Sequence, residues 1–271
     1  MLFGYGMKLG VKLLAHGRAK RGLRYLIVPV NYWRTVEFDL VYRAGDFQSA
    51  DRILDIGSPK LFSLYLADRI GAQVVATDIE DYFIPEYSLL RELEHVPAER
   101  YATGVQDGRA LGFPDESFTK VISISVVEHI PDDGDTRCLR EIRRVLAPGG
   151  RCVLTVPFSP VAKAEYRGQD GFYWAGSSAV AEGKGVFYQR RYDEQQLYSR
   201  LIEPSGMTLK DLRFVGERVL KHSEREFCDY LPLQLGPIHP LASRLVHTRP
   251  ATSWRDIPKP LCALVVLEKS A

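Results

Sequence analysis

The 271-residue sequence has no unbroken apolar run near the roughly 20 residues that a helix needs to cross a bilayer. Its four cysteines form no C-x-x-C pair, which argues against a structural zinc site and a disulfide framework and is typical of a reducing, cytoplasmic compartment. The H-E-x-x-H, G-x-S-x-G, P-loop and G-x-G-x-x-G patterns are absent as well. We therefore expect no metal site, and a nicotinamide-dependent oxidoreductase is disfavoured.

A strong charge excess is also missing, because 36 Lys and Arg residues against 34 Asp and Glu residues give a net charge of +2. This balance gives no reason to expect a nucleic-acid partner. A hydrophobic content of 45% and a charged content of 26% are ordinary for a globular protein. The length suffices for one large domain or two modest ones, and the sequence indicates no oligomeric state.

Acidic residues are missing from the N-terminal segment, where the first one is Glu37. The basic residues before it are Lys8, Lys12, Arg18, Lys20, Arg21, Arg24 and Arg34. We expect residues 1–44 to form a helical cap that packs on the domain and helps to cover the substrate. The alternative is an amphipathic segment, residues 1–34, that rests on an anionic membrane surface. A targeting peptide is disfavoured because no small-residue cleavage site follows.

A strand, a tight turn and a helix are predicted between residues 52 and 70. Residues 53–56 are mostly apolar and end at Gly57, which is typical of a parallel strand covered on both faces. Ser58 is a favoured helix N-cap, and Pro59 suits the first helical position, where its missing N–H costs nothing.

A second short strand, residues 73–77, follows and places Asp78 at its carboxyl end. Strand, helix and strand at this spacing predict a right-handed unit with parallel strands. Asp78 lies 23 positions beyond Asp55, and an acidic residue at this place accepts hydrogen bonds from ribose hydroxyls. The alternative is that Asp78 is an acidic helix cap or a solvated loop residue. Further strands are predicted at 101–105, 119–125, 151–156, 209–218 and 261–267, and further helices at 35–44, 87–95, 132–146 and 193–202.

Five stretches between Arg52 and Pro157 resemble, in order and spacing, a class I S-adenosylmethionine-dependent methyltransferase. They are LDIG (54–57), VVATDIE (74–80), QDGRALGFPDESFTKVIS (106–123), SVVEHI (125–130) and EIRRVLAPGGRCVLTVP (141–157). The resemblance implies an α/β fold, namely a Rossmann-like three-layer sandwich. Its mostly parallel, seven-stranded sheet would have the last strand antiparallel. It also implies S-adenosyl-L-methionine as the cofactor.

The resemblance assigns the expected cofactor contacts residue by residue. Asp55 and Gly57 match the first motif at the methionine end. Asp78 would hold the ribose hydroxyls, and Ile79 would lie against the adenine. Asp107 would accept from the adenine amino group. Gly108 would donate a hydrogen bond to the cofactor beside Asp107. Ser125 would line the side of the site that faces the sulfonium group of the cofactor.

One departure concerns Pro59 and Leu61, which stand where the family's first motif usually continues with glycines. Proline has no N–H and a fixed φ, so it cannot give the usual close backbone approach. Ser58 or Lys60 would then supply a polar contact instead. We interpret this as a variant site, with weaker cofactor affinity as the alternative.

The cap would precede a methyltransferase domain, residues 45–271, with substrate-side insertions at about 158–192 and 219–260. The first insertion is rich in aromatic residues, Trp174 among them, and would act as a substrate lid or pack on the domain. Its Arg190 and Arg191 are expected to face solvent rather than an anionic substrate group.

The function implied is methyl transfer to a small-molecule acceptor, of which a lipid or a sugar-linked compound is one type. His129 is a weak candidate for a general base, because Glu-His at this place often has a structural role in the family. The alternative is a cofactor-binding protein of this fold without catalysis, acting as a partner-binding module.

Overall fold

The computed structural model describes residues 2–168, 180–181, 185–221, 225–231 and 233–270. Trp174, which the lid prediction invoked, lies outside the described residues.

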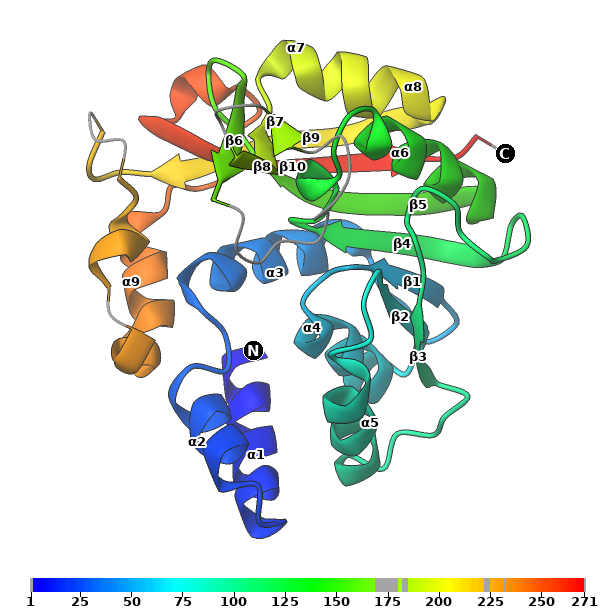
Figure 1. Cartoon of the computed structure of the whole chain (residues 1–271), viewed down its shortest axis with the longest axis vertical. Coiled ribbons are helices and arrows are strands. Elements are labelled where there is room, and N and C mark those ends of the chain that lie inside the picture. Colours follow the sequence, from blue (N-terminus) through cyan, green and yellow to red (C-terminus); the bar gives the residue numbers. More distant parts are fainter. Residues whose placement is uncertain (1, 169–179, 182–184, 222–224, 232, 271) are drawn as a thin grey trace.

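A seven-stranded sheet forms the centre of the molecule, with the strand order β3-β2-β1-β4-β5-β10-β9 (Figure 1). The neighbouring pairs from β3 to β5 are parallel, whereas β10 is antiparallel to both β5 and β9. This confirms the predicted fold class. The strands are β1 (Arg52–Ile56), β2 (Gln73–Asp78), β3 (Tyr101–Val105), β4 (Phe118–Ile124), β5 (Leu146–Pro157), β9 (Thr208–Glu217) and β10 (Lys259–Glu268).

Successive residues of the strands point into two different apolar cores, one on each face of the sheet. In β1, Ile53 packs with the helices α1 to α5, and Leu54 packs with α6. Both are fully buried, as expected of a parallel strand covered on both faces. The three layers are therefore helix, sheet and helix.

One layer contains α3 (Tyr32–Gly45), α4 (Lys60–Tyr65) with a π-helical turn (Leu66–Ile70), and α5 (Ile84–Leu93). The other contains α6 (Gly134–Val145) and a continuous helical segment made of α7 (Glu194–Gln196), a π-helical stretch (Leu197–Ile202) and α8 (Glu203–Ser205). A 3-10 turn (Val127–His129) precedes α6. Strand β5 begins at Leu146 rather than at residue 151, because Leu146 already pairs with Phe118.

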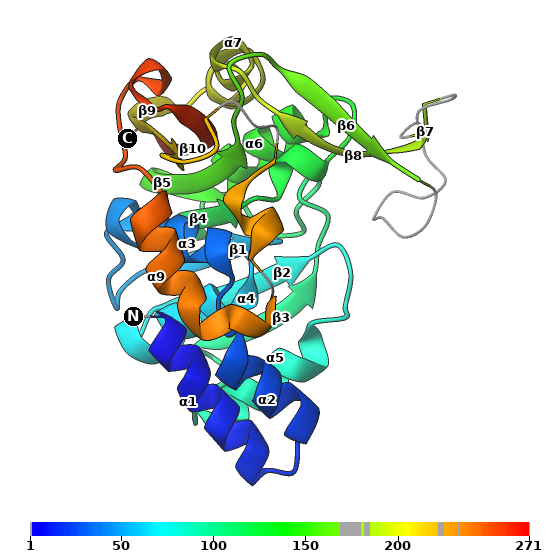
Figure 2. The same cartoon turned by 90° about the vertical axis from the view of Figure 1, so that its left-hand side faces the viewer.

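The first insertion contains a second sheet of β6 (Lys163–Arg167), β7 (Val180–Ala181) and β8 (Gly185–Arg191), which projects from the body in Figure 2. The expectation that Arg190 and Arg191 face solvent is wrong. Arg190 is buried, donates to the carbonyl of Ile130 and lies 3.8 Å from Asp135. Arg191 pairs with Glu165 at 2.6 Å. Both guanidiniums therefore fasten the insertion to the domain and to itself.

The second insertion contains α9 (His239–Val246), for which the sequence shows no clear period, together with three 3-10 segments: Phe227–Tyr230, Leu233–Ile238 and Trp254–Asp256. Before α3 come α1 (Leu2–Ala15) and α2 (Ala19–Ile27), which form an antiparallel hairpin at one end of the molecule (Figures 1 and 2). Across the ranges given above, no helix is long and apolar enough to span a bilayer.

Candidate functional site

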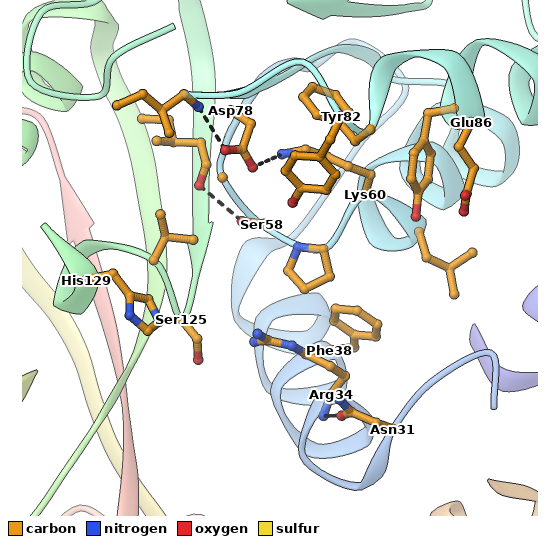
Figure 3. A pocket seen from close by; sticks show the side chains of 18 of the residues that line it. Asn31, Arg34, Phe38, Ser58, Lys60, Asp78, Tyr82, Glu86, Ser125 and His129 are labelled. Atoms are coloured by element: carbon orange, nitrogen blue, oxygen red, sulfur yellow. Dashed lines mark hydrogen bonds and ion pairs between the residues drawn. The ribbon is translucent and has the colours of Figure 1, made fainter. Parts of the chain in front are cut away.

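A cavity of about 870 Å³ lies at the carboxyl ends of the parallel strands. Its walls come from the tips of β1, β2 and β4, from the segment after β3, and from residues 24–38 of the N-terminal helices. This volume lies within the range of roughly 300–1,000 Å³ that small-molecule sites occupy. In Figure 3, Asp78 and Tyr82 lie on one side of the Ser58 turn, and Ser125 and His129 lie on the other.

The turn after β1 depends on glycine at position 57. Gly57 has φ +64°, and its N–H donates to the carbonyl of Thr77 at 2.8 Å. A Cβ atom at this position would lie 2.5 Å from Val126 Cγ1, closer than real contacts allow. Only glycine therefore suits both the backbone conformation and the space.

Ser58 does not cap the following helix, so that prediction is wrong. Helix α4 begins at Lys60 with Pro59 as its N-cap, and no side chain caps it. The Ser58 hydroxyl instead accepts the N–H of Ile124 at 2.8 Å, because the turn lies against the end of β4. Ser58 is buried and links the turn to the end of β4, beside the predicted sulfonium side of the cavity.

Lys60 lies between two carboxylates. Its Nζ is 3.7 Å from Asp55 Oδ2 and 4.0 Å from Asp78 Oδ2, and it donates to the carbonyl of Thr77 at 2.6 Å. Burial raises the pKa of both aspartates and lowers the pKa of Lys60, and the attraction between the charges opposes each shift. The lysine therefore balances two negative charges at the tips of β1 and β2.

Asp55 is fully buried and lies behind the turn, outside the cavity lining. Its Oδ1 accepts the N–H of Ser58 at 3.1 Å. In this structure Asp55 supports the turn, and its direct contact with the cofactor stays a prediction.

Asp78, Ile79, Asp107 and Gly108 all line the cavity, so the structure brings together the residues predicted for the ribose and adenine. Asp78 Oδ1 accepts the N–H of Ile79 at 2.8 Å. Gly108 approaches its surroundings closely, since an added Cβ would lie 3.1 Å from Cys138 Sγ. These positions fit a group that carries a diol and a flat ring.

Asp107 is held by Arg109, which sequence reasoning missed. The guanidinium donates to both carboxylate oxygens, at 2.7 Å for the shortest contact. Burial opposes ionisation of Asp107, but the hydrogen bonds from Arg109 outweigh it and lower the pKa below the usual value. A charged pair two residues apart in a loop gives no periodic signal in the sequence.

Ser125 lies at the end of β4 with φ +51°, in the left-handed region where a non-glycine residue is strained. Its N–H donates to the carbonyl of Thr155 at 3.0 Å, and its hydroxyl donates to the buried carboxylate of Glu37. Glu37 also accepts from Thr155 Oγ1 at 3.0 Å and from Arg34 at 2.6 Å. Helix α3 thus holds the predicted sulfonium side in place, a role that the sequence did not indicate.

His129 lines the same part of the cavity. Its Nδ1 lies 2.7 Å from the carbonyl oxygen of Tyr188, which only accepts, so Nδ1 carries the hydrogen and Nε2 of the neutral ring carries the lone pair. Burial lowers the pKa of His129. Burial also raises the pKa of the neighbouring Glu128 to about 8. Near neutral pH, Glu128 and His129 are therefore both mainly uncharged. The neutral ring of His129 can accept a proton at Nε2.

Among the side chains that the structure describes, no group of three or more His, Cys, Asp or Glu residues could hold a metal ion. The site therefore offers carboxylates, hydroxyls and an imidazole, together with close glycine backbone.

Comparison with known proteins gives consistent matches. A family model described as "Methyltransferase domain" matches residues 54–154. Methyltransferase GfsG of Streptomyces halstedii is 27% identical over 183 residues, which are 66% of this chain and 60% of GfsG. Phosphoethanolamine N-methyltransferase 2 of Caenorhabditis elegans is 28% identical over 118 residues, 43% of this chain and 26% of that protein. The matches span less than two thirds of the length of either relative.

Among solved structures, the [4+2]-cyclase SpnF has a TM-score of 0.58 at 17% identity, over 88% of this chain and 81% of that one. A likeness at this identity shows the shared fold alone. The family match and the sheet order confirm the resemblance seen in the sequence. Residues 54–154 therefore form a methyltransferase domain with the class I fold, and the cofactor of this fold family is S-adenosyl-L-methionine.

Proposed function

We propose that this chain transfers a methyl group from S-adenosyl-L-methionine to a small-molecule acceptor. The observation that carries the proposal is the continuity of one cavity from Asp78 and Asp107 to Ser125 and His129. The first two residues suit the nucleoside part of the cofactor. The last two lie where the methyl group and the acceptor would meet.

Bound S-adenosyl-L-methionine would supply an activated methyl group to a nucleophilic atom of the acceptor, with S-adenosylhomocysteine as the leaving group. The residues of the chain act mainly by holding the acceptor in line and by excluding water. Where the acceptor must lose a proton, His129 Nε2 accepts it, and Nδ1 stays hydrogen-bonded to Tyr188. Glu37 and Arg34 keep Ser125 in the conformation that shapes this end.

We propose a lipidic or sugar-linked acceptor because its part of the cavity has a mixed lining. Tyr25, Val28 and Phe38 supply apolar surface, and Arg24 and Arg34 supply positive charge. One relative is named for phosphoethanolamine, a small phosphate-bearing amine. We also propose a cytoplasmic location, which the four free cysteines support.

Calorimetric titration with S-adenosyl-L-methionine and S-adenosylhomocysteine tests the proposal. We expect both to bind, and a panel of lipid, phosphoamine and glycoside acceptors should reveal turnover by one class. Absence of binding to either compound would refute the proposal. Binding without any turnover would favour the non-catalytic, partner-binding alternative, for which Pro59 in the cavity wall is the structural argument.

A further inference from the structure

Helices α1 and α2 form a tight hairpin with a buried inner side. An added Cβ on Gly10 would lie 2.9 Å from the carbonyl oxygen of Gly22, so the two helices approach at these glycines. On the inner side, Leu9 and Leu13 of α1 and Tyr25 of α2 are buried in the core that covers the sheet.

The opposite side of the hairpin, here called the outer face, is apolar and exposed. It carries Met7, Val11 and Leu14 of α1, at positions i, i+4 and i+7, and Leu23 and Ile27 of α2, at i and i+4. Val11 is 59% exposed and Leu23 is 51% exposed. At 100° per residue, Val11 points about 160° away from Leu9 and Leu13, and Leu23 about 160° away from Tyr25. Single exposed apolar residues are common, but a stripe along two adjoining helices marks an interaction surface.

Positive charge borders the outer face. Arg18, Lys20 and Arg24 are exposed and have no side-chain hydrogen bond or ion pair within the described part of the chain. Residues 1–36 contain no acidic side chain. The acidic partners of the hairpin are Glu86 in α5, which pairs with Arg21, and Glu94 just after α5, which pairs with Lys8 and Lys12.

We propose that the outer face docks on an anionic lipid bilayer. An apolar stripe with free basic side chains at its border is complementary to the headgroups and upper acyl region of such a membrane. A second copy of the chain fits less well. A two-fold contact pairs this face with the same face of the other copy, and the hairpin has no acidic side chain that could pair with Arg18 or Lys20.

Docking also brings a wall of the cavity near the lipid surface. Tyr25, Val28 and Pro29, at the end of α2 and just after it, line the cavity. This consequence rests on the proposed function, whereas the docking itself does not.

Co-sedimentation with phosphatidylcholine vesicles, with and without phosphatidylglycerol, tests the proposal. We expect binding only to the anionic vesicles and weaker binding at high salt. A Val11→Ser/Leu23→Ser variant should bind at least tenfold more weakly, whereas Val161→Ser, which changes a 67% exposed valine far from the hairpin, should bind normally. An Arg18→Glu/Lys20→Glu variant should bind at least roughly 30-fold more weakly, since the loss of each basic residue costs about fivefold and the added negative charge weakens binding further. The matched control for charge is Arg140→Glu/Lys163→Glu.

The proposal fails if the unaltered protein does not bind anionic vesicles. It also fails if the control variants lose as much binding as the variants of the outer face. It also fails if Val11→Ser/Leu23→Ser only dissociates a dimer seen by light scattering. Calorimetry with S-adenosyl-L-methionine separates this outcome from the proposed function, because every variant should keep the affinity of the unaltered protein.

Discussion

The hydroxyl of Ser125, at the end of β4, donates a hydrogen bond to the carboxylate of Glu37 in α3, 88 residues earlier in the chain. The contact joins the N-terminal helices to the side of the cavity where the sulfonium group is predicted. It also holds a non-glycine residue at φ +51°, a conformation that persists only when its surroundings fix it.

Glu37→Ala removes the acceptor shared by Ser125, Thr155 and Arg34. Because buried donors then lose their partner, we expect the free energy of unfolding to fall by about 2–4 kcal/mol in urea denaturation. Asp39→Ala, on the exposed side of the same helix, should leave the unfolding midpoint unchanged. Equal effects of the two substitutions would contradict a structural role for Glu37.

Asp78→Asn tests the ribose contact. Loss of a charged acceptor should weaken S-adenosyl-L-methionine binding roughly 10- to 100-fold in calorimetry, because a hydrogen bond to a charged group contributes about 1.5–3 kcal/mol. The control is Asp81→Asn, since Asp81 is exposed and lies outside the cavity lining. Unchanged affinity in Asp78→Asn would show that Asp78 does not contact the cofactor.

Pro59→Gly tests the departure from the family motif. Pro59 has φ −61° and lines the cavity, and glycine would restore an N–H while loosening the turn. We expect the free energy of unfolding to fall by about 1 kcal/mol. The affinity for S-adenosyl-L-methionine should stay within roughly threefold of that of the unaltered protein, as expected if the turn is a functional variant of the family motif. A tenfold gain in affinity would instead show that proline weakens the site.

His129→Gln tests the general base. Where the acceptor must lose a proton, kcat should fall roughly 10²- to 10⁴-fold, while the affinity for S-adenosyl-L-methionine stays the same. The acidic limb of the pH–rate profile should disappear with the imidazole. His16→Gln is the control, because His16 is exposed at the end of α1. A kcat within threefold of the unaltered protein would reduce His129 to a structural residue.

Glu128 predicts a pH dependence of stability. Its pKa is raised by burial from 4.5 to about 8, so between these values the native state holds a proton that the unfolded state has released. The free energy of unfolding then decreases as pH rises, by up to roughly 1.4 kcal/mol per pH unit. The stability that Glu128 contributes is fully present below about pH 4.5 and is lost as pH rises through about 8.

Urea denaturation across this pH range measures the slope. Glu128→Gln, which keeps an uncharged side chain, should flatten it, and Glu116→Gln at an exposed position should not. The assignment is wrong if both variants follow the unaltered protein.

The sequence by itself determined the alternation of strands and helices and the residues at the strand tips. The apolar run of residues 53–56 ends at Gly57 because the turn needs positive φ, and this signal is local. Asp78 and Asp107 follow neighbouring parallel strands, so their approach at one edge of the sheet follows from topology. Asp78 was predicted from its place at the strand tip, and Asp107 from the resemblance to the methyltransferase family.

Only the tertiary structure decided which side chains support those residues. Lys60 lies between Asp55 and Asp78, Ser58 bonds to β4 instead of capping α4, and Arg190 is buried against the segment after β4. Except for the contact of Lys60 with Asp55, each contact joins segments that are distant in sequence and depends on how they pack together. Periodicity and capping rules describe one segment at a time, so they carry no information about these partners.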